Sequence, residues 1–200
     1  MPIQDARRLS TLKTEPLRNF KFHVKFTPVD TYTGAIGEDL WTESTMGGFT
    51  SISGLSVTTD PISYREGGYN TSVHQIPGLT TFTPISMQRG VMKGNAQAIK
   101  SMGRLFSATS DRAGQVASDT LPNFRYQIDV YVFDHPRDLG RSATDISQAA
   151  AQFTVYNAWI ASVAYSDLQA GENGIFVEQM SWVHEGFEAS LKDAGGIWDI

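Results

Sequence analysis

Histidine and acidic side chains are the groups in this sequence that could bind a metal ion or transfer protons. The four histidines are scattered along the chain: His23, His74, His135 and His184. No two of them stand four residues apart on a helix face, as a zinc site of the H-E-x-x-H type requires. The segment from Asp167 to Glu178 has the length of a calcium-binding loop, but Glu172 stands where that loop needs glycine. The sequence therefore predicts no metal site and assigns the histidines structural or surface roles.

Motifs of nucleophilic and nucleotide chemistry are absent as well. The chain has no cysteine, which excludes a thiol nucleophile, a thiolate metal site and disulfide bonds. It has no G-x-S-x-G, P-loop or G-x-G-x-x-G motif. The segment 66–68 resembles a phosphate-binding turn, but no helix start follows it, so a hairpin turn with glycine at positive φ is favoured. We expect a protein that is not an enzyme and that holds no cofactor.

Length and charge indicate a single, mildly acidic domain. The chain has 200 residues, with 16 Lys and Arg against 21 Asp and Glu, which gives a net charge of −5. This length suits one domain with its own core, and the acidic balance disfavours a nucleic-acid-binding surface. No run of about 18 apolar residues could span a membrane, and residues 1–25 lack the apolar centre of a signal peptide. We expect no membrane anchor and a protein made and used in a cytoplasm.

Alternating apolar and polar residues predict that strands make up most of the fold. The clearest alternation is in 20–26, where Phe and Val alternate with Lys and His, and in 125–133. The predicted strands are 20–26, 49–57, 82–89, 125–133, 152–165 and 174–185, the last two paired as a hairpin. Two tryptophans in these segments are expected in the core: Trp159 and Trp182.

Turn signals divide the segment that follows the first strand. A break is expected at Gly54, a bend at 58–61, a turn at 66–70 and a second turn at 76–79. The three segments expected to form long loops are 27–48, 108–124 and 135–151.

One helix is expected, over residues 95–107. Asn95 can cap it, and three apolar residues share one stripe at helical spacing: Ile99, Met102 and Phe106. Many strands, one helix and frequent turns predict a mainly β (β+α) fold, a small antiparallel β-barrel or sandwich with one flanking helix.

Several short motifs occur in a definite order along the chain. They are Pro16–Val24, Gly48–Val57, Ile62–Asn70, Pro77–Leu79, Arg89–Gly90, Asn157–Trp159, Asp167–Ala170 and His184–Glu188. Each alone has little specificity. Their order and spacing together closely resemble the tail tube protein family of contractile-tailed bacteriophages, and the tubes of tailocins and contractile injection systems are similar. The resemblance covers most of residues 16–188.

The resemblance implies a subunit with an extended hairpin loop that assembles as a hexameric ring, and rings that stack into a hollow inner tail tube. In the family, the segment around the Y-R-E-G-G turn reaches a neighbouring ring. The candidate assembly residues in this sequence are therefore Val57, Asp60, Pro61, Ile62, Tyr64, Arg65, Glu66, Gly67, Gly68 and Asn70. Residues 1–15 are expected to form a flexible N-terminal arm, 16–188 the tail-tube domain and 189–200 a C-terminal tail.

The resemblance also implies partners for such a tube. A tail sheath protein, a baseplate hub and a tape-measure protein are expected beside the homo-hexamer, and DNA is expected to pass through the lumen without specific binding. Acidic side chains facing the lumen would repel DNA phosphates and let the DNA slide. Asp60, Arg65 and Glu66 carry both charge signs and are expected to make contacts between rings. The expected location is the virion tail, assembled in the cytoplasm of the bacterial host.

Two other functions remain open. The chain could form the inner tube of a tailocin or contractile injection system, which conducts an effector or ions instead of a genome. It could also be a monomeric β-sandwich that binds a ligand through Trp41 and the long loops. Oligomeric state separates this binding module from both tubes, and gene neighbourhood separates the two tubes.

Overall fold

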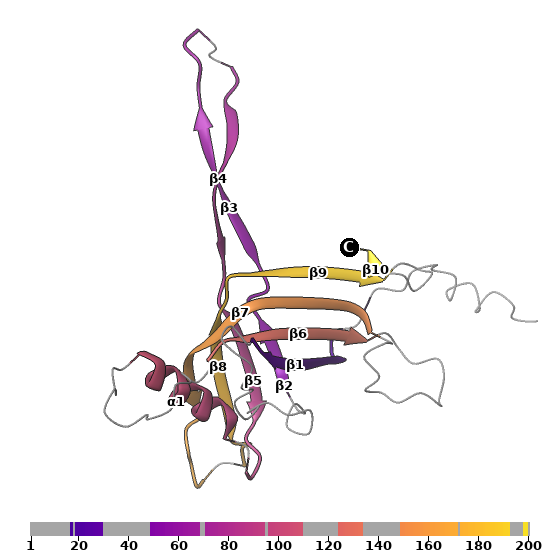
Figure 1. The fold of residues 1–200 in the computed structure, drawn as a ribbon, viewed down its shortest axis with the longest axis vertical. Helices are drawn as coiled ribbons and strands as arrows, with labels where there is room; N and C mark the ends of the chain where they lie inside the picture. The colour runs from indigo at the N-terminus through magenta and orange to yellow at the C-terminus, as the bar shows by residue number, and fades with distance from the viewer. Residues whose placement is uncertain are drawn as a thin grey trace, which may run out of the picture.

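A computed structural model describes residues 17, 19–29, 49–68, 71–94, 96–109, 124–133, 149–171, 173–192 and 198–199 (Figure 1). The elements in chain order are β1 (Phe22–Pro28), β2 (Phe49–Ser53), β3 (Val57–Tyr64), β4 (His74–Phe82), β5 (Ile85–Gly90), α1 (Gln97–Thr109), β6 (Tyr126–Phe133), β7 (Ala149–Tyr165), β8 (Val177–Val183), β9 (Gly186–Lys192) and β10 (Trp198–Asp199). The described part is therefore mostly strand, as the alternation predicts, with one helix among these elements.

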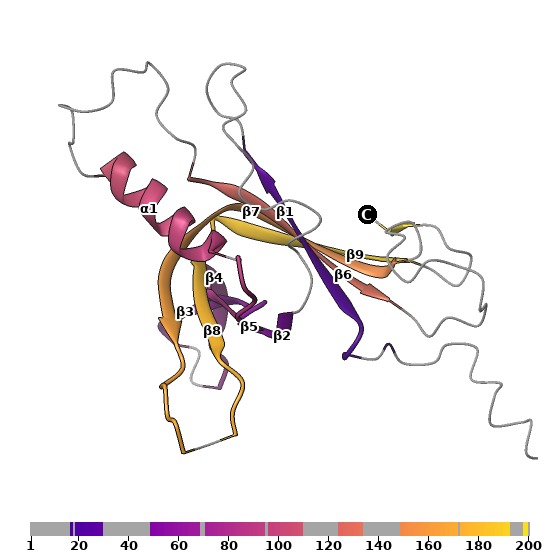
Figure 2. The ribbon, with the colours of Figure 1, turned by 90° about the horizontal axis from the view of Figure 1, so that it is seen from below.

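Eight strands form one antiparallel sheet, and β3 and β4 form a separate two-stranded sheet. The strand order in the large sheet is β1-β6-β7-β8-β5-β2, with β9 paired to β7 and β10 to β9. β7 is 17 residues long and belongs to both halves of this sheet. Its first part pairs with β6 and β9, and its last part pairs with β8. Figure 2 shows β7 bending between the two halves, so the sheet folds onto itself.

The core lies between the two halves of the folded sheet. Its largest side chains come from five strands: Val24, Phe26, Ile85, Met87, Tyr126, Ile128, Val130, Val155, Ile160, Met180 and Trp182. The ring centroid of Phe26 in β1 is 5.2 Å from that of Trp182 and 6.0 Å from that of Phe49 in β2. Because β1 and β2 stand at opposite ends of the strand order, these contacts close the sheet into one sandwich-like barrel. Burial of each such side chain contributes about 1.5–3 kcal/mol. The predicted antiparallel fold with one flanking helix is confirmed.

Helix α1 packs against β7 through a different stripe from the expected one. Ala98 is buried and Met102 packs on the core, whereas Ile99 and Phe106 are 49 % and 62 % exposed. Of the three residues on the apolar stripe, Met102 packs inward and the other two do not, so this stripe is not the face that the helix buries. The small Ala98 side chain lets the helix backbone approach the sheet, and this turns the bulkier neighbours outward. The expected N-cap, Asn95, lies outside the described residues.

Two of the expected interruptions are continuous strand. The bend predicted at 58–61 lies within β3 and the second turn predicted at 76–79 lies within β4, so both predictions are wrong. Pro61 and Pro77 are register partners across these two strands. In a two-stranded ribbon each strand has one unpaired edge, so a residue without an N–H group is tolerated there. The hairpin is therefore longer than the sequence suggests, and β4 is its second strand.

The other strand predictions agree closely with the structure. β1 runs on through Pro28, and β7 begins at Ala149, ahead of the expected start at residue 152. The break at Gly54 is confirmed, because β2 ends just before it. Pro84 lies between β4 and β5 rather than inside one strand over 82–89.

The two tryptophans of the predicted strands differ in burial. Trp182 is fully buried, as expected, whereas Trp159 is only half-buried. β9 continues to Lys192, beyond residue 188, where the tube domain is expected to end. Trp41 and most of the three expected long loops lie outside the described residues.

Candidate assembly surface

The β3–β4 hairpin stands apart from the folded sheet as a long two-stranded ribbon (Figure 1). Its register runs from Val57 opposite Phe82 at the root to Tyr64 opposite His74 near the tip. The eight residues of β3 alone span about 26 Å at roughly 3.3 Å per residue. Every residue of the two strands is exposed except Gly78, which is half-buried. Both faces of the ribbon are therefore open along its length.

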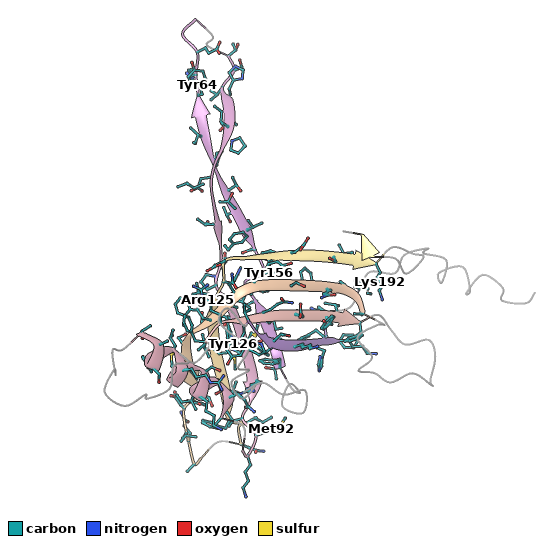
Figure 3. The ribbon with its side chains drawn as sticks, in the orientation of Figure 1. Tyr64, Met92, Arg125, Tyr126, Tyr156 and Lys192 are labelled. Carbon is teal, nitrogen blue, oxygen red and sulfur yellow. The ribbon has the colours of Figure 1, made fainter. Side chains whose placement is uncertain are left out.

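One face of the outer part of the hairpin carries exposed apolar side chains. The register shift adds its extra residue to β4, so β3 alternates without interruption and places Ile62 and Tyr64 on one face and Val57 on the other. Ile62 and Ile76 are direct register partners, so their side chains are neighbours, whereas Phe82 shares the face of its partner Val57. Ile62, Tyr64 and Ile76 are exposed, and Figure 3 shows Tyr64 near the tip of the ribbon. We call these three residues the hairpin stripe. Exposed apolar side chains grouped on a free-standing ribbon mark a surface that another molecule covers.

Close contacts hold the root of the hairpin. Gly54 has φ +97°, and a Cβ atom at this position would lie 2.3 Å from the backbone oxygen of Pro84, so only glycine fits. The Ser56 hydroxyl donates to Thr83 Oγ1 at 2.9 Å. The backbone N–H of Thr83 donates to the carbonyl oxygen of Ser56 at 3.2 Å. These contacts join the segment that enters the hairpin to the segment that leaves it.

The turn between β8 and β9 supports this root. Nε2 of His184 donates to the carbonyl oxygen of Thr83 at 3.1 Å. The buried His184 ring also lies 5.7 Å from the ring of Phe82, which itself packs 6.1 Å from Phe187. The structural role expected for His184 is confirmed. Through its contacts with Thr83 and Phe82, His184 connects the hairpin to the body of the subunit.

Glu185, the next residue, joins β6 and β7 to the same turn. Its carboxylate forms an ion pair with Arg125 and accepts a hydrogen bond from Asn157 Nδ2 at 2.7 Å. Its backbone N–H donates to the carbonyl oxygen of Tyr156 at 3.2 Å. Asn157 has φ 52°, a left-handed conformation that Asn adopts more readily than most residues. The Arg125 guanidinium, and then the Asn157 amide, hold the pKa of Glu185 below its ordinary value. Glu185 therefore joins Arg125 and Asn157 through its ionised carboxylate, next to the hairpin root.

The outward face of β1, β6, β7 and β9 is polar and hydrogen-bonded. Alternation and register place these side chains on it: His23, Lys25, Thr27, Gln127, Asp129, Tyr131, Gln152, Thr154, Tyr156, Glu188 and Ser190. We call this set the polar face. Asp129 accepts from Thr154 Oγ1 at 2.9 Å and from Gln127 Nε2 at 3.2 Å, and only 5 % of it is exposed. The Tyr156 hydroxyl donates to Glu188 Oε2 at 2.7 Å, and this bond raises the pKa of Tyr156.

The charges on the polar face have both signs. Four residues lie in one row across β1, β6, β7 and β9, each in register with the next: Lys25, Asp129, Thr154 and Glu188. By alternation, Lys21 and Lys192 extend the same face at the ends of β1 and β9. Because its hydrogen-bond partners cover Asp129, the more accessible charges are the three lysines and Glu188. The polar face is thus not acidic.

Comparison with known proteins identifies the family of this chain. The sequence model of a family described as T4-like virus tail tube protein gp19 matches residues 18–188. The chain belongs to this tail tube family. The resemblance inferred from the order of motifs is therefore confirmed. The family has a structural role in tail tubes, which agrees with the expectation that this tail tube protein is not an enzyme. No curated protein matches the chain in a comparison of sequences.

Solved tube structures share the fold of this tail tube protein. One is the sheath-tube complex of the extracellular contractile injection system PVC in its extended state, with a TM-score of 0.60 and 19 % identity over 91 % of this chain and 97 % of that chain. A second is the tube-terminating cap of the anti-feeding prophage, with a TM-score of 0.59 and 19 % identity over 89 % and 93 %. A third is the six-fold symmetrised baseplate of the anti-feeding prophage, with a TM-score of 0.59 and 18 % identity over 88 % and 96 %. At these identities the likeness shows a shared fold.

The assembly residues named from the sequence lie together on the hairpin of the tail tube protein. Those in β3 are Val57, Asp60, Pro61, Ile62 and Tyr64, and those beyond it are Arg65, Glu66, Gly67 and Gly68, all exposed. Gly68 has φ +97°, as the turn interpretation of this segment requires. Asn70 lies outside the described residues.

Sequence reasoning missed the contacts around the hairpin root and the β4 member of the hairpin stripe. Ile76 was hidden because it lies within the predicted turn at 76–79, and the contacts of His184 and Glu185 join distant parts of the chain. The family motifs that contain Asn157 and His184–Glu188 were the available signal. Within the ranges that the structure describes, no His, Asp and Glu side chains gather to hold a metal ion. No helix there is long and apolar enough to cross a membrane.

Proposed function

We propose that this tail tube protein forms hexameric rings that stack into a hollow tube, and that the tube conducts DNA into the host cell. The hairpin stripe carries this proposal, because Ile62, Tyr64 and Ile76 are exposed on a ribbon that the described chain does not cover. Burial of the stripe against another copy would contribute about 25 cal/mol per Å² of apolar surface. A subunit with a ribbon on one side suits a head-to-tail contact, which gives a filament instead of a closed dimer.

The open edges of the sheet support closure into a ring. β1 pairs with β6 alone, and β9 pairs with β10 only near its end, among the strands that the structure describes. An unpaired strand edge is a template for pairing with another copy. Pairing β1 of one subunit with β9 of the next would join their polar faces into one continuous wall. Six subunits follow from the family resemblance, and the matched prophage baseplate was symmetrised six-fold.

The polar face is our candidate for the wall of the lumen. Its side chains bond to one another, as in the contacts of Asp129 with Thr154 and of Tyr156 with Glu188. Donors and acceptors that are already paired offer few specific contacts to a passing molecule. This property suits a conduit through which DNA moves without specific binding.

The charge of the polar face favours a second candidate, the tube of a tailocin or contractile injection system. Lys21, Lys25 and Lys192 accompany Glu188 on this face, whereas an acidic wall would repel DNA phosphates more strongly. A wall without net negative charge suits a protein cargo better than the acidic wall expected from the sequence. Cryo-electron microscopy of particles from producing cells separates the candidates, because a phage tube ends in a DNA-filled head.

A tube in a contractile system needs further proteins. We include a tail sheath, a baseplate hub and a tape-measure protein among the partners, with assembly in the host cytoplasm and a final location in the tail. The matched structures support the first two, since they are described as a sheath-tube complex and a baseplate.

Negative-stain electron microscopy of the purified protein over a concentration series tests the proposed function. We expect rings with a central hole, and tubes of uniform width at higher concentration. Isolated tails added as templates cover the case in which assembly needs a starting ring. Monomers at every concentration, with and without templates, would contradict the proposal and favour the monomeric binding module.

A further inference from the structure

A second exposed apolar surface lies at the end of the molecule opposite the hairpin. It is formed by Met92, which follows β5, and by Tyr165, Leu168 and Ile175, which surround the connection from β7 to β8. We call these four residues the loop-end patch. Leu168 and Ile175 are 82 % and 81 % exposed, although both are large aliphatic residues. Figure 3 shows Met92 and Tyr64 at opposite ends of the long axis of the molecule.

The loop-end patch is preorganised by contacts within the subunit. The backbone N–H of Val91 donates to the carbonyl oxygen of Phe176 at 2.9 Å, which brings the end of β5 beside the start of β8. The Tyr165 and Phe176 rings stack with centroids 5.5 Å apart and planes 15° apart. Ser166 and Val177 exchange two hydrogen bonds, of 2.8 Å and 3.1 Å. The base of the loop is therefore held in place before a partner binds, which lowers the ordering entropy of binding there.

From these observations we infer that the loop-end patch of one subunit receives the hairpin of the subunit stacked on it. This inference rests on the proposed tube and identifies the receiving surface of its ring-to-ring contact. Two apolar surfaces at opposite ends of one chain are the arrangement that a heterologous, head-to-tail interface requires. Each surface covers the other, so every copy inside the tube loses both of its exposed apolar ends.

Charge complementarity supports the same pairing. The hairpin tip carries Arg65 and Glu66, and the loop-end patch is flanked by Asp167 and Lys93. All four are exposed in the subunit, so each can meet a partner of opposite sign in the next copy. The inference places Arg65 of one copy beside Asp167 of the other. Such pairs set orientation and register at an interface more than they add affinity.

The exposed side of α1 is the competing receiver. Ile99 and Phe106 are also exposed apolar residues, but Figure 1 shows α1 to one side of the body rather than at the end opposite the hairpin. A hairpin that bound α1 would have to lean away from the long axis. The loop-end patch is therefore the better match in direction and in charge.

Cross-linking in assembled tubes tests this inference, and the absence of native cysteine makes the result clear to interpret. Tubes are assembled from equal amounts of a Tyr64→Cys variant and a Leu168→Cys variant, and treated with a short bismaleimide. We expect covalent dimers that contain one copy of each variant. The matched control replaces Leu168→Cys by Phe106→Cys, for which we expect at least about tenfold fewer dimers. Dimers from the Phe106→Cys mixture alone, or from neither mixture, would overturn the inference.

Charge reversal gives an independent measurement. Arg65→Asp and Asp167→Arg are each expected to reduce the tube fraction about tenfold while rings persist, since the ring interface is elsewhere. The double variant is expected to restore tubes to within about threefold of the wild type. A double variant that assembles no better than the single variants would contradict the assigned pair. If the wild type forms neither rings nor tubes, the proposed function fails; if wild-type tubes form without these effects, only the inference fails.

Discussion

Gly78 of β4 lies directly against the backbone oxygen of Asp60 in β3. A Cβ atom at Gly78 would stand 2.5 Å from that oxygen and 3.1 Å from Cγ1 of Ile62. This close approach occurs where the hairpin register shifts, between Thr59 and Pro61. A bulge of this kind increases the local twist of a ribbon. The contact therefore determines the direction in which the tip of the hairpin points.

Substitution of Gly78→Ala is expected to distort the middle of the hairpin while the body stays folded. Overpacking of this kind costs about 1–3 kcal/mol, so the amides of β3 and β4 should exchange with solvent about tenfold faster or more. Tubes should become fewer at a given concentration. Gly67→Ala is the matched control, because nothing lies within 4 Å of a Cβ atom at Gly67. Equal exchange rates in the two variants would contradict the role assigned to Gly78.

The contacts of the Glu185 carboxylate with Arg125 and Asn157 predict a pH-dependent contribution to stability. Hydrogen bonds from Arg125 and Asn157 lower the pKa of Glu185 from its ordinary value of 4.5. A lowered folded-state pKa stabilises the protein above about pH 4.5, and that stabilisation is lost as the pH falls through the folded-state pKa. The Tm difference between wild type and Glu185→Gln should therefore be largest near neutral pH and shrink below pH 4.5. Glu66→Gln, at the exposed hairpin tip, is the control; equal differences at pH 7 and pH 3 for Glu185→Gln would refute the prediction.

The buried ion pair between Arg89 and Glu178 predicts strong coupling in a double-mutant cycle. Nε of Arg89 donates to Glu178 Oε2 at 2.7 Å, and both side chains are almost fully buried. Arg89→Met alone is expected to lower the free energy of unfolding by about 3–5 kcal/mol, because it leaves a buried charge without its main partner. The double variant Arg89→Met, Glu178→Leu should lose less than the sum of the two single losses. Chemical denaturation measures all three values, and simple additivity would argue against the coupling.

The packing of Trp182 predicts a large loss of stability on truncation. The indole is fully buried and contacts the rings of Phe26 and Tyr126, with centroids 5.2 Å and 5.9 Å away. Trp182→Ala should lower the free energy of unfolding by about 3–5 kcal/mol, since the change leaves a cavity between the halves of the sheet. Phe20→Ala removes an exposed ring and should change stability by about 0.5 kcal/mol or less. Similar losses in the two variants would disagree with the described core.

Alternation of apolar and polar residues was sufficient to predict which side chains of β1 and β6 are buried in the core. In 20–26 and 125–133 the apolar residues occupy every second position, and Phe26, Ile128 and Val130 are buried as the pattern requires. Helical spacing was less informative for α1, where Ile99 and Phe106 face outward. Helical spacing identifies a stripe, but the fit of the small Ala98 against β7 decided which stripe faces inward.

The hairpin shows a different limit of sequence reasoning. Pro61 and Pro77 are turn signals in most contexts, yet here they are partners in one ribbon. A pattern of Pro and Gly cannot distinguish a turn from a strand with free edges, because both tolerate a missing N–H group. For the same reason, Ile76 could not be assigned to the hairpin stripe before the strands were paired.

Composition, alternation and motif order were enough to establish the class of this protein: an acidic, cysteine-free, mainly β chain whose motif order is that of a tail tube family. The sequence also located the exposed turn around Arg65 and Glu66. The tertiary structure was needed to show that His184 bonds to the hairpin root, that Glu185 joins Arg125 and Asn157 to the turn beside it, and that the hairpin stripe and loop-end patch lie at opposite ends. These contacts join residues that are far apart in the sequence. Local periodicity reflects neighbours along the chain, whereas these surfaces depend on contacts between strands that are far apart in it.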